Sequence, residues 1–274
     1  SSFSETGYVP GIGADDTLAL KQFFTSQFGA PKRTYLVGAS MGGNVVALAL
    51  ENHASEYDGA LAVCGALGGE EQLDYLASWL MVGQSLGGVS LPLESGNVQL
   101  LLAGLLSLSG RLGDPAQPTL QGRQFMSVMN NLTGGPRPFF MEGLRQQWQV
   151  NFGFVLADPQ RKSIPFAAVS TENARYAIDP ALGISNDQLN ASIARLKALP
   201  GARDAKAHPD AVPTSGVLGK PLLTLHDTGD LFVPISNEQS YRQKAEAAGK
   251  GDLLVQRVIR AAGHCQFSDE ERLA

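Results

Sequence analysis

The sequence contains few cysteines, no run of basic residues and no apolar stretch long enough to cross a bilayer. Two cysteines among 274 residues exclude a small disulfide-dense scaffold and leave the compartment open, with a secreted or periplasmic location the preferred interpretation. The formal net charge is −5 and the basic residues are scattered, which argues against nucleic acid or an anionic membrane as the main partner. The longest apolar stretch, residues 98–108, is interrupted by Gln99 and Gly104, so we expect no membrane span.

Metal-binding spacings are also missing. The four histidines and two cysteines form no HxxxH, HExxH or Cys/His cluster, so we expect no metal ion and no cofactor. The chain has no internal repeat, which excludes a solenoid or a propeller. What is present is a chain with 43% hydrophobic residues, enough to form the core of one large domain or of a domain with a sizeable insertion.

Four short apolar runs are typical of buried strands. They cover residues 34–37, 59–67, 221–226 and 253–259. Helical patterns alternate with these runs, which predicts a parallel sheet covered by helices on both faces.

The segment between the second and third runs has a different, mostly helical pattern, with leucines and aromatic residues recurring at helical spacing. We therefore predict that residues 1–68 and 216–274 form the core that contains the sheet. Residues 69–215 are predicted to form a large, mainly helical cap inserted between two strands.

Local signals set the expected helix boundaries. Near the N-terminus we expect a loop over residues 1–13 and then a helix that turns Leu20, Phe23 and Phe24 inward. Three later helices carry capping-box patterns at their starts, which pair Ser185 with Gln188, Ser236 with Gln239, and Ser268 with Glu271.

A serine stands at the junction of the first strand and the following helix. Residues 38–43 read GASMGG, so Ser40 has glycines two positions before and after it. A tight strand–turn–helix with this G-x-S-x-G pattern presents its serine as a nucleophile. The glycines suit such a turn because neighbouring segments leave no room for Cβ atoms. Ordinary turns contain the pattern too, so it needs support from elsewhere in the chain.

An acid and a histidine follow the later strands. The third run ends in HDTGDLFVP, where Asp230 is the preferred catalytic acid and Asp227 fits a carboxylate that caps the turn. His264 follows the last strand in AAGHCQF and is the preferred base. Of the other histidines, His53 and His208 are expected at the surface, and His226 is expected to be a hydrogen-bonded structural residue.

These residue types supply the parts of a nucleophilic acyl transfer. A serine hydroxyl is a weak nucleophile that needs a base, and the imidazole of histidine titrates near neutral pH. Asp230 would orient the ring of His264. The backbone N–H of Met41, the residue after the nucleophile, would donate to the oxyanion.

In this chain order, Ser40, Asp230 and His264 resemble the catalytic triad of the α/β-hydrolase family. The matching motifs are GASMGG, HDTGDLFVP and AAGHCQF, and the resemblance covers the residues outside the predicted cap. It implies the α/β-hydrolase fold, with a mostly parallel sheet flanked by helices and a cap between the sixth and seventh strands. It also implies that the three residues act together as a triad.

Cys265 directly follows His264. In related tannases and fungal feruloyl esterases, a cysteine beside the catalytic serine pairs with one beside the catalytic histidine, but residue 39 here is alanine. Cys64, at the end of the neighbouring strand, is therefore the candidate partner of Cys265. Two buried free thiols are the alternative.

The chain departs from the family before Ser40. The family places several strands, and a loop that donates the second oxyanion N–H, ahead of the nucleophile, whereas 39 residues precede it here. We therefore expect the N-terminal strands of the fold to be absent from this chain. A missing N-terminal segment or a separate chain would complete the sheet, whose edge would otherwise be exposed.

The preferred function is a serine hydrolase that cleaves carboxylic esters of small molecules with an apolar moiety. Four aromatic residues of the predicted cap are candidates for substrate contact: Trp79, Phe139, Phe140 and Trp148. Two alternatives stay open. A prolyl-type aminopeptidase has the same triad order and would hold a substrate amine with Glu142 or Glu172. A catalytically silent binding protein on the same scaffold is the other.

Overall fold

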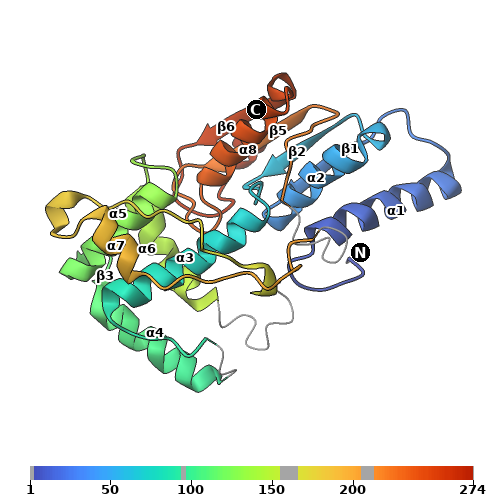
Figure 1. Ribbon diagram of the computed structural model, residues 1–274. Coiled ribbons are helices and arrows are strands. Elements are labelled where there is room, and N and C mark those ends of the chain that lie inside the picture. Colours follow the sequence, from blue (N-terminus) through green and yellow to red (C-terminus); the bar gives the residue numbers. More distant parts are fainter. Residues whose placement is uncertain (1–2, 94–96, 155–165, 205–212, 274) are drawn as a thin grey trace.

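The computed structural model describes residues 3–93, 97–154, 166–204 and 213–273 (Figure 1). Its main sheet contains four parallel strands in the order β1-β2-β5-β6, which are β1 (Tyr35–Ala39), β2 (Gly59–Val63), β5 (Leu222–Asp227) and β6 (Leu254–Ile259). Each lies within or overlaps one of the predicted runs, so the predicted parallel sheet is confirmed. Because the strands are parallel, their carboxyl ends meet at one edge of the sheet, where the loops carrying polar residues begin.

One face of this sheet is covered by helices α2 (Met41–Asn52) and α8 (Ser236–Ala247). Apolar residues of α2 are fully buried against the strands, and Tyr241 and Ala245 of α8 join the same core. Helix α1 (Pro10–Phe28) packs on the outside of α2 (Figure 1).

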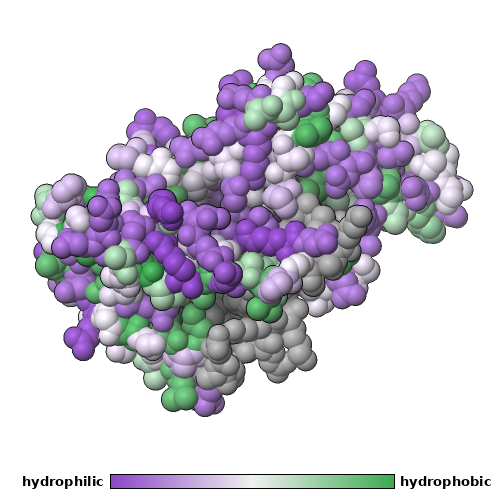
Figure 2. Space-filling model, viewed as in Figure 1, coloured by the Kyte–Doolittle hydropathy of each residue, from purple (hydrophilic) through white to green (hydrophobic). Residues whose placement is uncertain are grey.

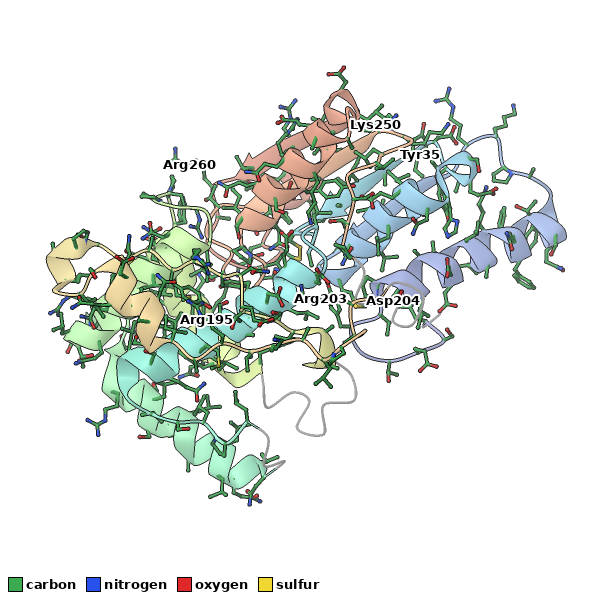
Figure 3. All side chains as sticks on the ribbon, viewed as in Figure 1. Tyr35, Arg195, Arg203, Asp204, Lys250 and Arg260 are labelled. Atoms are coloured by element: carbon green, nitrogen blue, oxygen red, sulfur yellow. A yellow bond between two sulfur atoms is a disulfide. The ribbon has the colours of Figure 1, made fainter. Side chains whose placement is uncertain are left out.

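The opposite face of the sheet is largely exposed, so the prediction that helices cover both faces is wrong for this face. Tyr35 and Val37 of β1 are 59% and 72% exposed, and Leu223 and Val255 on this face are also exposed. Figure 3 labels Tyr35 on β1, an edge strand of the sheet. Near the strand ends, Cys265 and Phe267 pack on this face. The expectation of further strands beside β1 stays a prediction.

The first helix also corrects the prediction. It begins at Pro10, inside the stretch expected to be a loop, because proline suits the first position of a helix. Its buried residues are Pro10, Gly13 and Ala14, all in the first turns. Three residues expected to turn inward are instead about half exposed or more: Leu20, Phe23 and Phe24.

Residues between β2 and β5 form a helical segment, as the periodicity predicts. Its elements are α3 (Glu70–Gly87), α4 (Val98–Leu112), the two-stranded ribbon β3 (Gly113–Asp114) and β4 (Gln117–Pro118), α5 (Leu120–Leu132), α6 (Phe140–Gly153) and α7 (Asn186–Ser192). The remaining elements are α9 (Asp269–Leu273) and the 3-10 turns η1 (Ala54–Glu56), η3 (Phe166–Ala168), η4 (Pro180–Leu182) and η6 (Gly251–Leu253).

This helical segment has its own aromatic core. Trp79, Phe125, Trp148 and Phe152 pack with ring centroids 5.0–6.2 Å apart, mostly edge to face. On α4, leucines alternate between this core and the surface: Leu101 and Leu105 are buried, and Leu102 and Leu106 are exposed. Figure 2 shows apolar surface in the lower left of the molecule, where Figure 1 places α4.

A cluster of charged residues lies at the start of α3 in the helical segment. Arg203 donates to Glu70 at 2.9 Å and to both carboxylate oxygens of Asp74 at 2.6 and 2.8 Å (Figure 3). Both acids lie on α3, so the cluster joins the chain near residue 203 to the start of that helix.

Two of the three predicted capping boxes form. Ser185 and Gln188 exchange both hydrogen bonds, and so do Ser268 and Glu271. At α8 the box does not form, because Ile235 already has helical dihedral angles and its carbonyl accepts from Glu238. The preceding turn therefore runs directly into the helix, and its first serine is not at the cap position.

Candidate active site

Ser40 lies in the tight turn between β1 and α2. Its φ of 57° and ψ of −122° are sparsely populated for a residue with a side chain. The turn is held by its neighbours, since Ser40 N–H donates to the Val63 carbonyl at 2.9 Å and Ser40 C=O accepts from Gly43 and Ala66. The sheet therefore fixes a strained backbone that presents the serine hydroxyl at the strand end.

Two glycines are required at this turn by close contact, and one of them was not expected. A Cβ on Gly38 would lie 2.0 Å from the Gly42 carbonyl oxygen, and one on Gly43 would lie 2.4 Å from the Gly65 Cα. A Cβ on Gly42 would have no atom within 4 Å. Crowding therefore selects glycine at 38 and 43, whereas the pattern pointed to 38 and 42.

The structure brings the three predicted polar residues into contact. His264 Nδ1 lies 2.6 Å from Asp230 Oδ2, and its Nε2 lies 2.9 Å from Ser40 Oγ. With Nδ1–H donating to the carboxylate, the serine hydroxyl donates to the unprotonated Nε2. The Asp230 side chain is fully buried, whereas His264 is partly exposed. Residues that follow β1, β5 and β6 thus meet at one edge of the sheet.

The backbone of its own loop holds the Asp230 carboxylate. Oδ1 accepts from the N–H groups of Phe232 and Val233 at 2.9 and 3.0 Å, which leaves Oδ2 for His264. Asp227 points to a different task, because its Oδ2 accepts from the Gln266 N–H at 2.8 Å, two residues beyond His264. The pKa of Asp227 is raised to about 6. Burial is the main cause and the charge of Asp230 adds to it, while the hydrogen bond from the Gln266 N–H acts in the opposite direction.

Helix α6 of the helical segment fastens the loop that carries Asp230. Gln147 accepts from the N–H groups of Leu231 and Phe232 through Oε1 and donates to the Ala262 carbonyl at 3.0 Å through Nε2. It thereby ties the Asp230 loop to the His264 loop. The helix approaches so closely that a Cβ on Gly143 would lie 1.8 Å from the Gly229 carbonyl oxygen. The sequence pattern did not single out Gln147, because the contact exists only after the segment folds onto the sheet.

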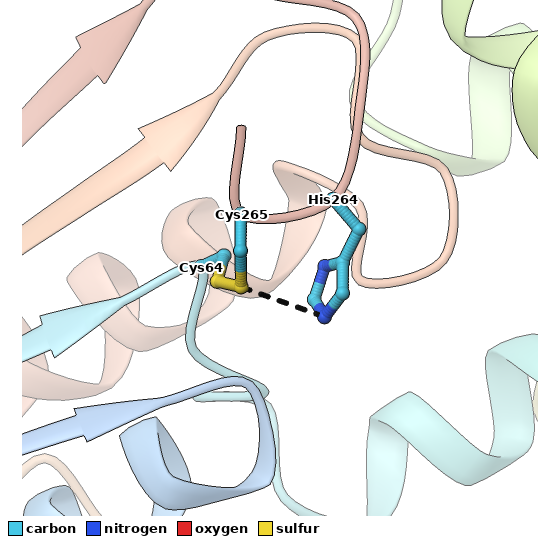
Figure 4. Close-up of side chains that lie close together, drawn as sticks. All are labelled: Cys64, His264 and Cys265. Atoms are coloured by element: carbon cyan, nitrogen blue, oxygen red, sulfur yellow. Dashed lines mark hydrogen bonds between the residues drawn. A yellow bond between two sulfur atoms is a disulfide. The ribbon is translucent and has the colours of Figure 1, made fainter. Parts of the chain in front are cut away.

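A disulfide joins Cys64, directly after β2, to Cys265, with Cα atoms 5.3 Å apart (Figure 4). Cys265 Sγ lies 3.7 Å from His264 Nε2. Ser40, Cys64 and Cys265 are three of the four described non-glycine residues with positive φ. The strained backbone of the described chain is therefore concentrated around the serine and histidine.

The N-terminal end of α2 faces the same point. Met41 is its first residue, so its backbone N–H has no partner within the helix. The positive end of the helix dipole adds to the potential felt by an anion near Ser40.

The aromatic residue beside the histidine is Phe232. Its ring centroid lies 5.4 Å from that of His264, and Phe154 packs against it in turn at 5.5 Å. Trp79, Trp148 and Phe140, which were proposed to contact substrate, lie buried in the core of the helical segment. Phe139 is 37% exposed at the start of α6. The substrate role of these four residues stays a prediction, and their packing already accounts for three of them.

The other two histidines that the structure describes have partners other than Ser40. His53 pairs with Asp15 at the surface, with Nε2 2.8 Å from the carboxylate. His226 is fully buried behind Asp230. His208 lies outside the described residues.

One group of potential metal ligands occurs in the described part of the chain: Cys64, His264 and Cys265, with ligand atoms within 4.8 Å of one another. Its two sulfur atoms are bonded to each other and offer no thiolate. Within the described ranges, no helix has the length and apolar character needed to span a membrane.

No protein-family model and no curated protein matches the sequence. Among solved structures, the chain matches a monoacylglycerol lipase from Paleococcus ferrophilus, at 13% identity and a TM-score of 0.35, covering 94% of this chain and 68% of that one. An acetylester hydrolase from Corynebacterium glutamicum is 16% identical with a TM-score of 0.37, covering 94% of this chain and 63% of that one. The esterase LipA from Xanthomonas oryzae, which degrades rice cell walls, is 14% identical with a TM-score of 0.38, covering 97% and 62%. This chain thus spans 62–68% of the length of these three proteins.

Proposed function

We propose that the protein is a serine hydrolase that cleaves carboxylic esters through an acyl-enzyme intermediate. The observation that carries the proposal is the unbroken contact from Ser40 Oγ to His264 Nε2 and from His264 Nδ1 to Asp230 Oδ2. The strained turn at Ser40 supports it, because such a backbone persists only where the surrounding structure imposes it.

The reaction follows from the positions of these groups. Ser40 Oγ attacks the ester carbonyl carbon while its proton passes to His264 Nε2, and the resulting oxyanion accepts from the Met41 N–H. The C–O bond to the alcohol then breaks, and the alcohol oxygen takes the proton from His264. Water attacks the acyl-enzyme in the same way, which releases the acid and restores Ser40. Asp230 stabilises the imidazolium that forms in each half-reaction.

The helical segment of residues 69–215 acts, in this proposal, as a cap over an apolar part of the substrate. Phe232 beside His264, with Phe154 behind it, provides apolar surface next to the reacting atoms. Of the two acids considered for an aminopeptidase, Glu172 forms an exposed ion pair with Lys197, and Glu142 is exposed. Neither is a buried anchor for a substrate amine, so the ester is the preferred substrate class.

Labelling by a fluorophosphonate tests the proposed nucleophile. We expect wild-type protein to be labelled at Ser40 and the Ser40→Ala variant to be unlabelled and inactive on p-nitrophenyl esters of graded acyl length. Aminoacyl-proline anilides, assayed in parallel, separate the ester hydrolase from the aminopeptidase. Folded wild-type protein that is neither labelled nor active on either substrate would contradict the proposal and favour the binding protein.

A further inference from the structure

The carboxylate of Asp230 faces two histidines with the same oxygen. Oδ2 lies 2.6 Å from His264 Nδ1 on one side and 3.9 Å from His226 Nε2 on the other. His226 is the next-to-last residue of β5, and its side chain is completely buried, with 0% of its surface exposed. A second imidazole therefore lies behind the acid that orients the first.

Both ring nitrogens of His226 face groups that only accept hydrogen bonds. Nε2 lies 2.8 Å from the Val233 carbonyl oxygen, so it carries a proton. Nδ1 lies 3.3 Å from Glu238 Oε1, poorly aligned for a hydrogen bond, and neither atom has another partner among the described residues. A lone pair on Nδ1 would face a carboxylate lone pair there, so the imidazolium is the form that fits.

Two hydrogen-bond donors contact the other carboxylate oxygen of Glu238. Its Oε2 accepts from Thr224 Oγ1 at 2.7 Å and from the amide of Gln256, both of which are donors. Glu238 lies in the first turn of α8, where the helix dipole favours negative charge. Burial lowers the pKa of His226, but the nearby Glu238 carboxylate, the charge of Asp230 and the Val233 carbonyl outweigh this effect and raise the pKa to about 9.

Other charged groups surround the pair. Arg137 donates to the Thr228 carbonyl at 2.6 Å and interacts with Asp230 through its charge. Asp227, next to His226 on β5, feels the charges of both His226 and Asp230. None of these replaces His226 as the cation closest to the Oδ2 atom that binds His264, because the Arg137 guanidinium donates to backbone and hydroxyl oxygens instead.

We propose that His226, held as an imidazolium by Glu238, is a positioning residue that shares Asp230 Oδ2 with His264 and thereby weakens the hold of that carboxylate on the His264 proton. This inference rests on the proposed function of the triad. The cation behind Asp230 offsets part of its negative field, so His264 remains neutral, and able to accept the Ser40 proton, down to lower pH than beside an unshared carboxylate.

The consequence appears in the acid limb of the pH profile of kcat/KM, which reports the protonation of the free enzyme's base. The variant His226→Gln/Glu238→Gln removes both buried charges together and retains amide donors, whereas His226→Gln alone would leave Glu238 buried without a cation. We expect the midpoint of the acid limb to move to higher pH by roughly half a unit to one unit in the double variant. The control is His53→Gln, which removes a surface histidine and should leave the midpoint unchanged.

Nitrogen-15 NMR of the histidine rings provides a readout that needs no activity. In Ser40→Ala protein at pH 7 we expect both ring nitrogens of His226 to be protonated, and the His264 titration midpoint to rise when His226 and Glu238 are both replaced by glutamine. A neutral His226 ring, or an unchanged His264 midpoint in a folded double variant, would overturn the inference. If the double variant does not fold, the protonation state of His226 in wild-type protein still decides it. Failure of the proposed hydrolase would show instead as absent labelling at Ser40 with the NMR result intact.

Discussion

At the scale of single residues, two aspartates three positions apart have separate tasks. Asp230 contacts the His264 ring, whereas Asp227 accepts from the backbone of Gln266 and so shapes the loop that carries the histidine. The sequence pattern preferred Asp230 as the acid and Asp227 as a turn-capping residue, and in the structure the two side chains point in different directions.

Replacing each aspartate by asparagine tests this division. We expect Asp230→Asn to lower kcat by about 10³–10⁴-fold, because the amide favours the wrong tautomer of His264. Asp227→Asn retains an oxygen for the Gln266 N–H and should keep most of the activity. Steady-state kinetics on one ester measures both, and equal losses in the two variants would contradict the assignment.

The buried His226–Glu238 pair also predicts a pH dependence of stability. The pKa of His226 is raised to about 9 in the folded protein, above its value in the unfolded chain of about 6.5. Its contribution to the free energy of unfolding is therefore fully present below about pH 6.5 and is lost as the pH rises through about 9. Urea denaturation across this window should show a steeper fall for wild type than for His226→Gln/Glu238→Gln, and parallel curves would contradict it.

At the scale of elements, the turn after β1 shows how contact selects glycine. The G-x-S-x-G pattern located the turn, but the spacing of the second glycine did not predict where space is lacking. That depends on the Gly65 backbone, which approaches Gly43 from the next strand's loop.

Alanine substitutions at this turn should separate the two kinds of glycine. Gly38→Ala would bring its Cβ to 2.0 Å from the Gly42 carbonyl oxygen. We therefore expect the free energy of unfolding to fall by more than about 2 kcal/mol and the activity to be lost. Gly42→Ala is the matched control and should be tolerated, because a Cβ at this position has no atom within 4 Å. Thermal denaturation with an activity assay measures both, and a destabilised Gly42→Ala would contradict the contact argument.

The disulfide links two elements at the site, the end of β2 and the loop that carries His264. It closes a separation of 201 residues, so we expect Cys64→Ser/Cys265→Ser to lose about 2–5 kcal/mol of stability. Activity should fall further than the unfolded fraction explains, because the His264 loop loses its anchor next to Nε2. Measuring kcat at a temperature where both proteins are fully folded separates the two effects, and an unchanged kcat there would show that the disulfide serves stability alone.

At the scale of the whole molecule, the helical segment and the sheet meet at the Asp230 loop. Gln147 on α6 binds both the Asp230 and His264 loops, and Asn151 donates to the Leu231 carbonyl at 2.7 Å. Docking of the segment therefore bears directly on the geometry of the triad, although its helices lie far from Ser40 in the sequence.

Gln147→Ala tests this dependence. We expect kcat/KM to fall by about 10–100-fold, because the Leu231 and Phe232 N–H groups lose a buried acceptor and the two loops lose their link. Gln146→Ala, one position away and exposed, is the control and should behave as wild type. Ester kinetics on folded protein provides the measurement, and equal activity of the two variants would show that the loops hold their positions without α6.

The sequence by itself determined the alternation of strands and helices, the parallel sheet and the chain order of Ser40, Asp230 and His264, because hydrophobic periodicity and turn residues act over a few neighbouring positions. It misjudged the start of α1, the burial of Phe23 and Phe24, and the cap of α8, where packing and the preceding turn outweigh local preference. Only the tertiary structure decided that Gln147 binds the Asp230 loop and that His226 lies beside Asp230. These contacts join residues that are distant in the chain, and no local pattern records the direction in which a folded side chain points.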